Sequence, residues 1–450
     1  MAVTFSGAMD RAPLRAFQVV TFAVCMVVLT CDGMDNQLLG IIAPSVIKEF
    51  AVAKGTFGWA MSAALVGFGF GSWGGGWLGD TIGRRWSLAI AAAVFSLATI
   101  GAAMAGGVWS LAAWRFVSGL GFGAAYATAI ALAGEWLPDR WRSVAVTTLS
   151  VGTPAGGTIV GWVAPGIVKQ YGWQTAFVAL GMVTLLVVAL VVAALRDSPS
   201  FLMARGRRDK AEARAARLLG EPVELAPELH ASEGGNAIGV LHRSNLRMNV
   251  GIGIAFTACA LCAYGVLNWS TTLLTAHGFT LAQAGNAVSI GGLTSIVASV
   301  AAGWLVYRFG SNAVIAGISG SLFVMMIVFA LAVQRLPVAP GADDRLLVIV
   351  VMGVTAAIFS AGMASMYAML THGYPPSCRS AGIGFGIFMG RVGAISASGL
   401  GGWLLDLGHG NVYPFFGVLA AGALLISSAA FIGDRRVPAA RPARRAEAVA

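Results

Sequence analysis

The stretch Thr30-Cys31-Asp32-Gly33-Met34-Asp35-Asn36-Gln37 lies inside an apolar run that extends from residue 17 to residue 47. The run is long enough for a membrane-spanning helix, which needs about 20 apolar residues. A carboxylate near the bilayer centre is costly and usually faces a partner charge or a water-filled path. Asp32 and Asp35 are three residues apart, so they lie on one helix face. The first predicted span therefore presents an acidic surface to the protein interior.

The whole chain has the composition of a membrane protein. Of its 450 residues, 57% are hydrophobic and 11% are charged, whereas a soluble protein carries about 25% charged residues. Long apolar runs without strict alternation exclude a transmembrane β-barrel. They predict an all-α polytopic membrane protein with twelve transmembrane helices. The expected spans are 17–46, 58–79, 86–106, 109–133, 143–168, 174–195, 249–275, 283–306, 312–333, 346–370, 380–404 and 412–432.

The twelve spans form two halves that repeat. Gly76-Trp-Leu-Gly-Asp-Thr-Ile-Gly-Arg-Arg85 has a copy at Gly303-Trp-Leu-Val-Tyr-Arg-Phe-Gly-Ser-Asn312, and each copy follows the second span of its half. We expect two pseudo-symmetric six-helix bundles, a common plan in transporters. The predicted domains are an N-terminal bundle (1–195), a cytoplasmic linker with an amphipathic helix (196–248) and a C-terminal bundle with a short cytoplasmic tail (249–450). The linker helix, at 205–219, is expected to lie on the inner membrane surface.

The distribution of charge predicts the orientation. The formal net charge is +10, and Lys and Arg gather in alternate loops, which places both termini in the cytoplasm. The charge is therefore no sign of a nucleic-acid partner. The five cysteines form no disulfide framework, and no P-loop, metal-ligand spacing or serine-nucleophile motif is present. We expect neither an enzyme nor a cofactor or metal site.

A second intramembrane charge lies in the eleventh span. Arg391 is about eleven residues beyond Ser380, or roughly 16 Å at helical rise, and so near the bilayer midplane. Its guanidinium fork suits a carboxylate. We expect Arg391 to bind an anionic substrate; a permanent ion pair with Asp32 or Asp35 is the alternative.

The seventh span carries Tyr264, Asn268 and Trp269. These side chains could stack on, or hydrogen-bond to, an aromatic ring of the substrate. The alternative role for such aromatic side chains is packing or anchoring at the membrane interface.

The fourth span begins and ends with charged residues. Arg115 lies about six residues inside its outer boundary, roughly 9 Å deep, where it either contacts the interior or snorkels to the headgroups. Glu135 is expected to form a gating charge network with Arg140 and Arg142, or else a solvated cap.

Two further residues lie around the predicted loop between the tenth and eleventh spans. Arg379 is interpreted as a gate cation. His372 could titrate near neutral pH, but a lone histidine at a helix end is more often a satisfied interfacial residue.

These motifs resemble those of a known family. Gly76–Arg85 is similar to the loop signature of the major facilitator superfamily, and Arg115-x-x-x-Gly-x-Gly to its fourth-span pattern. Asp32-Gly-Met-Asp35 resembles the first-helix motif of the aromatic acid:proton symporters. The match extends through the Gly156–Gly161 stretch and Tyr171-Gly172-Trp173. It departs where Gln174 replaces a usual Arg, and where Ser270 and Thr271 replace a usual Leu-Pro.

The resemblance implies a function. Asp80 and Arg84 would form a cytoplasmic latch, with the Asp80 carboxylate against a helix N-terminus, and Arg115 would take part in proton coupling. The implied protein is a monomer in the bacterial inner membrane. It imports a benzoate- or hydroxybenzoate-like carboxylate with protons through alternating access.

In this scheme Asp32 and Asp35 bind the coupling proton and border the substrate; as a coupled pair they leave open which one titrates. The alternatives are a drug:proton antiporter, another organic-anion carrier, or a non-transporting sensor of aromatic acids.

Overall fold

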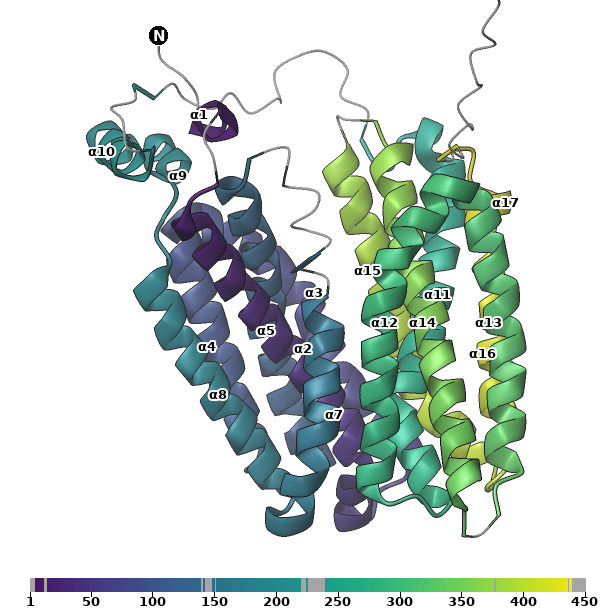
Figure 1. Cartoon of the computed structure of the whole chain (residues 1–450). Helices are drawn as coiled ribbons and strands as arrows, with labels where there is room; N and C mark the ends of the chain where they lie inside the picture. Colours follow the sequence, from purple (N-terminus) through teal and green to yellow (C-terminus); the bar gives the residue numbers. More distant parts are fainter. Residues whose placement is uncertain are drawn as a thin grey trace, which may run out of the picture. The chain divides into compact units, whose positions relative to one another are not determined.

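The computed structural model describes residues 5–11, 14–138, 141, 148–149, 151–219, 224–225, 239–337, 339–375, 378–435 and 437–438. Long α-helices dominate these residues (Figure 1). The chain divides into two compact units. Unit 1 comprises Met1–Val52 and Ala60–Gly235, and unit 2 comprises Ala53–Trp59 and Asn236–Ala450. The division at Gly235 falls inside the segment that the sequence indicates as a linker.

Unit 1 is built from long helices with three short ones beside them. The long helices are α2 (Ala16–Phe50), α3 (Lys54–Ile82), α4 (Arg84–Ala102), α5 (Val108–Trp136), α7 (Gly152–Tyr171) and α8 (Trp173–Ala194). The short helices are α1 (Phe5–Arg11), α9 (Pro199–Ala204) and α10 (Arg208–Leu219). The fifth predicted span, 143–168, begins outside the described residues.

Unit 2 repeats this order of long helices. They are α11 (Leu246–Ala276), α12 (Leu281–Phe309), α13 (Ser311–Gln334), α14 (Ala342–Gly373), α15 (Arg379–Leu407) and α16 (Tyr413–Leu425), with the short η1 (Arg243–Asn245) and α17 (Ser428–Phe431). Within the described part of the chain, ten helices are long and apolar enough to cross a membrane. The other two predicted spans correspond to α3 and α7. The expected all-α polytopic fold is confirmed.

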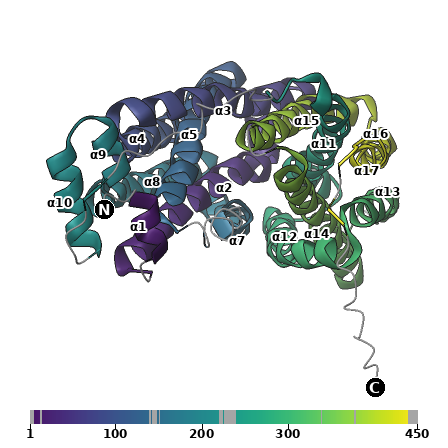
Figure 2. The same ribbon diagram turned by 90° about the horizontal axis from the view of Figure 1, so that it is seen from above.

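The two units share one pattern of helix packing. In unit 1, α2 packs on α5, α7 and α8, and α4 packs on α5 and α8; in unit 2, α11 packs on α14, α15 and α16, and α13 packs on α14 and α16. Counted by their order along each unit, these are equivalent pairs of spans. Figure 2 shows the structure from above. The repeated loops also agree, because Gly83 and Gly310 each precede the third long helix with φ of +98° and +82°. The predicted pseudo-symmetry is confirmed.

Glycines allow the helix pairs α2–α7 and α11–α15 to approach closely. A Cβ atom on Gly33 would overlap the backbone of Thr153, and one on Gly156 would overlap the backbone of Thr30. In unit 2, a Cβ atom on Gly393 would overlap the backbone of Thr257. Small residues of this kind let membrane helices touch through their backbones. The helix that carries Asp32 and Asp35 is thereby fixed against α7.

The amphipathic helix of the linker packs on protein. Ala211, Ala215 and Leu219 of α10 are buried in one apolar cluster with Phe5 and Met9 of α1. Leu202 of α9 and Trp136 of α5 belong to the same cluster. The apolar face of this helix packs on α1 and α9, in keeping with the amphipathic character that the sequence predicts. The position of the helix on the inner membrane surface stays a prediction.

The first turns of α3 belong to unit 2, although the sequence predicts an N-terminal bundle that includes them. The Gly55 backbone N–H donates to Asp406 Oδ2 at 2.8 Å. The ring of Phe57 meets Trp269 edge-on, with 6.5 Å between centroids. The close approach of α3 to α15 requires glycine at position 58, because a Cβ atom there would overlap the Ser398 carbonyl oxygen.

Candidate functional site

Unit 1 contains a buried ion pair between two distant helices. Arg115 Nη1 of α5 lies 2.7 Å from both Oδ1 and Oδ2 of Asp35 on α2. The Arg115 and Asp35 side chains are 2% and 7% exposed. Thr99 of α4 adds a longer hydrogen bond of 3.5 Å to Asp35 Oδ1. Arg115 therefore points inward and does not snorkel, and it balances the charge of Asp35 inside unit 1.

The second aspartate has a different hydrogen-bond donor. Asp32 is buried, and its Oδ2 accepts a hydrogen bond of 3.3 Å from the hydroxyl of Thr153 on α7. Its neighbour Asp35 accepts from a guanidinium. The two carboxylates share a helix but have different surroundings.

In unit 2, Arg391 lies beside Tyr264, as expected for two residues that are predicted to contact the same substrate. Arg391 lies in the middle of α15, and its Nη1 donates to the Tyr264 hydroxyl of α11 at 3.2 Å. Both side chains are half-buried. The guanidinium is thus held within a membrane-spanning helix and oriented by an aromatic hydroxyl.

One helical turn further along α11, Asn268 is almost fully buried. Its Nδ2 donates to Ser398 Oγ at 2.9 Å. Among the described residues, its Oδ1 has no hydrogen-bond partner. A buried acceptor without a donor costs about 1–3 kcal/mol. Asn268 is therefore suited to receive a donor from a ligand.

Trp269 differs from these three residues. It is fully buried and packs on Phe57 at the start of α3. Trp269 also faces Gly401 and Gly402 of α15, and among the described residues its Nε1 has no hydrogen-bond partner. Its predicted contact with substrate stays a prediction.

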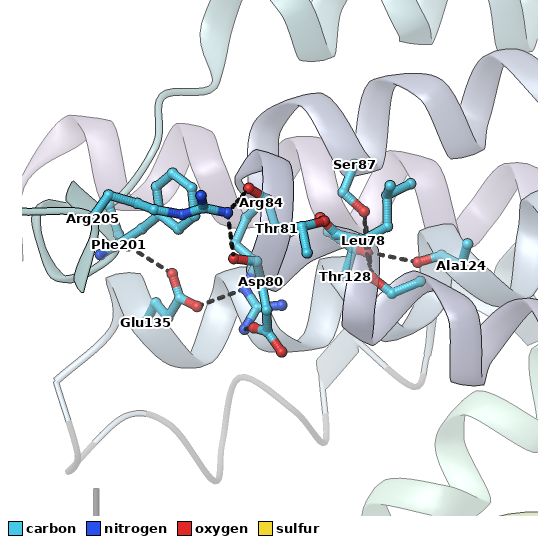
Figure 3. Close-up of polar contacts among 12 residues, drawn as sticks. Leu78, Asp80, Thr81, Arg84, Ser87, Ala124, Thr128, Glu135, Phe201 and Arg205 are labelled. Atoms are coloured by element: carbon cyan, nitrogen blue, oxygen red, sulfur yellow. Dashed lines mark hydrogen bonds and ion pairs between the residues drawn. The ribbon is translucent and has the colours of Figure 1, made fainter.

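A second group of charges surrounds the turn between α3 and α4 (Figure 3). Arg84 Nη2 lies 2.7 Å from Asp80 Oδ1, and Arg84 Nε lies 2.8 Å from Glu135 Oε1 of α5. Asp80 is 67% exposed, whereas Arg84 is only 16% exposed. Arg84 is therefore the centre of this network, which we call the α3–α4 charge cluster and define as Asp80, Arg84, Glu135, Ser198 and Arg205.

Two members of the cluster come from the linker and could not be found from loop signatures. The hydroxyl of Ser198, the N-cap of α9, donates to Glu135 Oε2 at 2.8 Å. Arg205 Nη2 donates to the last carbonyl groups of α3, at Asp80 and Thr81. A cation at a helix C-terminus is favourable, because the carbonyls there carry negative partial charge. The linker thereby stabilises the turn in two places.

The remaining predicted gate residues are only partly described. Arg140 and Arg142 lie outside the described residues, and the partner that the structure gives Glu135 is Arg84. Arg379 is the first residue of α15, and its side chain is also outside the description. No group of three or more potential metal ligands occurs among the residues that the structure covers.

The end of α14 holds one exposed and one buried titratable group. His372 is exposed, and its Nδ1 lies 3.0 Å from the Ala368 carbonyl oxygen. Tyr374 is buried and donates to Asn249 Oδ1. Burial raises the pKa of Tyr374 to about 12. The phenol therefore stays protonated at neutral pH and holds the end of α14 against α11.

Two repeated helical units with charged side chains inside their spans define a polytopic membrane protein of the transporter type. Residues 25–357 match the Major Facilitator Superfamily. The chain belongs to this superfamily. The fold agrees with that of the xylose transporter XylE of E. coli, to which it is similar with a TM-score of 0.72, 18% identity, and coverage of 94% of this chain and 99% of that one.

Relatives with known names point to one kind of cargo. The chain is 28% identical to a gallate transporter of Pseudomonas putida, across 89% of this chain and 88% of the relative. It is 28% identical to the 4-hydroxybenzoate transporter PcaK of Acinetobacter baylyi, across 94% and 91%. A benzoate transport protein of the same organism is 25% identical, across 95% and 92%. The resemblance to aromatic-acid carriers is confirmed by these similarities.

Proposed function

We propose that this protein is a secondary transporter that imports an aromatic carboxylate together with protons, by alternating access. The observation that carries the proposal is Arg391 in the middle of a span, with its guanidinium hydrogen-bonded to the Tyr264 hydroxyl. A cation at this depth is a functional site by default. A planar carboxylate is its best-matched ligand, because the guanidinium can donate two parallel hydrogen bonds.

The aromatic part of the substrate is supported by the relatives' names and by neighbouring residues. Gallate, 4-hydroxybenzoate and benzoate each carry a carboxylate on an aromatic ring. With the carboxylate at Arg391, the ring is placed against Tyr264, where aromatic pairs gain about 0.5–1.5 kcal/mol beyond area burial. Asn268 Oδ1 offers an acceptor for a polar ring substituent.

Proton coupling is assigned to unit 1. Asp32 and Asp35 are buried within a span, and Asp35 forms an ion pair with Arg115. Protonation of one carboxylate would release part of this pairing and so couple proton binding to a change in helix packing. Asp32 and Asp35 are proposed to bind the coupling proton as a coupled pair.

The α3–α4 charge cluster is proposed as the gate, with Arg140, Arg142 and Arg379 as further gate cations. Asp80 remains largely exposed and is therefore available to form and break contacts during a transport cycle. We place the protein as a monomer in the bacterial inner membrane with both termini in the cytoplasm, in keeping with the positive-inside rule.

Uptake into proteoliposomes tests the proposal. Radiolabelled 4-hydroxybenzoate and benzoate should accumulate under an inward proton gradient, and a protonophore should abolish the accumulation. Xylose serves as the non-aromatic control. Binding without accumulation would contradict transport and favour a sensor, whereas no binding of either acid would reject the cargo.

Three variants separate the residue roles. Arg391→Ala should raise the KM for the carboxylate at least tenfold, because a charge-assisted bidentate contact is lost, while Tyr264→Phe should have a smaller effect. Asp32→Asn should abolish proton-driven accumulation but retain exchange of substrate across the membrane. Asp343→Asn, an exposed acid at the start of α14, is the matched control. Robust accumulation by Asp32→Asn would remove this aspartate from the mechanism.

A further inference from the structure

Unit 2 contains an apolar groove that has no role in the proposed transport site. It lies between α12 and α13, with α14 as its floor, and has a volume of about 510 Å³. This volume is within the range of about 300–1,000 Å³ that small-ligand sites occupy. The lining is almost wholly apolar: Ala298, Ala301, Leu305, Phe309, Ala313, Val314, Gly317, Ile318, Ser321, Ala357, Ile358 and Ala361.

The sequence creates the groove by placing small residues along one face of each helix. Ala298, Ala301 and Leu305 recur at helical spacing on α12, and Ala313 and Gly317 do so on α13. A Cβ atom on Gly317 would meet no atom within 4 Å. The three helices are long and apolar enough to span a membrane. The medium that meets this groove is therefore hydrocarbon.

A cation lies at the end of the groove. Arg308 is exposed at the last turn of α12, and its Cζ is 5.9 Å from the ring centre of Phe309, which lines the groove. Within the described part of the chain, no ion pair involves Arg308. The neighbouring Trp304 and Tyr307 are 62% and 67% exposed. Aromatic side chains of this kind are typical of the interface between hydrocarbon and headgroups.

We propose that this groove binds one anionic phospholipid, with an acyl chain between α12 and α13 and the headgroup phosphate on Arg308. The apolar lining matches the chain, and the guanidinium matches the phosphate. Basic positions between spans are established places for anionic lipid headgroups. The proposal rests on unit 2 alone and does not depend on which substrate the protein carries.

The repeat in the sequence explains why the cation is available. In the first copy of the loop, Arg84 is paired with Asp80 and Glu135. In the second copy, Tyr307 stands where the acid would be, and Ser311 stands where the arginine would be. Arg308, at the position of Thr81 in the first copy, lies in the last turn of α12, where that carboxylate is missing. It is thereby left to bind an anion from outside the protein.

Native mass spectrometry of the delipidated full-length protein tests the site, with phosphatidylglycerol and phosphatidylcholine as probes. The wild-type protein should retain one phosphatidylglycerol more tightly than phosphatidylcholine. Arg308→Gln should weaken phosphatidylglycerol binding by about fivefold, the effect of one interfacial cation, and should remove the preference over phosphatidylcholine. Arg335→Gln, an exposed cation at the other end of α13, should leave both unchanged.

The groove itself is tested by a matched glycine pair on α13. Gly317→Leu should fill the groove and lose both lipids, whereas Gly320→Leu should bind as the wild type does. Both glycines have open space around an added Cβ atom, but only Gly317 lines the groove. Equal binding by the two variants would overturn the proposal. So would equal retention of both lipids by the wild type, or a dimer that Gly317→Leu abolishes.

Discussion

The two copies of the α3–α4 type of turn have the same backbone and opposite electrostatics. Both end a long helix at a glycine with positive φ. In the first copy the arginine is surrounded by two carboxylates, and the linker adds Ser198 and Arg205. In the second copy Ser311 takes the place of that arginine, and Arg308, at the position of Thr81, lies over an aromatic ring. The repeat therefore keeps the geometry of the turn while the charge around it changes.

The same contrast extends into the spans. In unit 1, the buried Arg115 is bonded to a carboxylate of its own unit. In unit 2, Arg391 donates to a phenol. The printed hydrogen bonds therefore give the two arginines different neighbours, a carboxylate for Arg115 and a phenol for Arg391.

The largest loss of stability is expected when the buried Asp35–Arg115 ion pair of unit 1 loses its arginine. Arg115→Met should destabilise the protein by about 3–5 kcal/mol, because it leaves the buried Asp35 carboxylate without its cation. Thermal unfolding of the purified protein measures the loss. The double variant Asp35→Asn, Arg115→Met should recover most of it, since no buried charge remains. A double variant as unstable as the single one would show that packing, not charge, is the contribution of Arg115.

A smaller effect is expected in the first loop. Glu135→Gln should cost about 1.5–3 kcal/mol, the range for a hydrogen bond to a charged group. Asp80→Asn should cost about 0–1 kcal/mol, because the carboxylate is 67% exposed and screened by water. Unfolding midpoints of the two variants give the comparison. Equal losses of stability in the two variants would mean that the more buried ion pair of Arg84 is no stronger than the exposed one.

Replacing the glycine at each turn tests whether the two turns contribute equally to the stability of the protein. Gly310→Ala should cost about 1–2 kcal/mol, because an L-residue is strained at positive φ. Gly83→Ala should cost more than this, since its Cβ atom would also lie 2.6 Å from Asp197 Oδ1. The same unfolding measurement applies. A larger loss from Gly310→Ala would reverse the expected order of the two turns.

The smallest effect is expected when the second copy is given the acid of the first. Tyr307→Asp replaces a side chain that is 67% exposed, so the free energy of unfolding should change by less than about 0.5 kcal/mol. Arg308 would then have an acid nearby, so phosphatidylglycerol retention in the mass-spectrometric assay should fall. Unchanged retention would show that the missing acid is not what leaves Arg308 available.

The sequence predicts the helices well because a membrane span needs a long apolar run, and it finds the repeated loop because the glycines recur. It also indicates Asp35, Arg115, Arg391 and Tyr264 as functional residues within the spans. It does not predict that Asp35 pairs with Arg115, because 80 residues separate them and only helix packing brings them together.

Other contacts lie beyond sequence patterns for the same reason. The sequence favours pairing of Glu135 with its near neighbours Arg140 and Arg142, yet the cation that the described residues place beside it is Arg84 on another helix. The roles of Ser198 and Arg205 depend on α9 folding back onto α3 and α5, which no local pattern encodes. Likewise, an amphipathic pattern shows that α10 must bury one face, but membrane and protein satisfy the pattern equally well.

The close packing of α3 also bears on how the chain enters the membrane. Gly67, Gly71 and Gly75 let α3 meet the backbone of α5. The same glycines lower its hydropathy, and α3 is absent from the helices that are apolar enough to span by themselves. Insertion into a bilayer follows summed hydrophobicity, so α3 is a weak insertion signal. Stable integration of α3 during biosynthesis should therefore wait until α5 has emerged from the ribosome and packed against it.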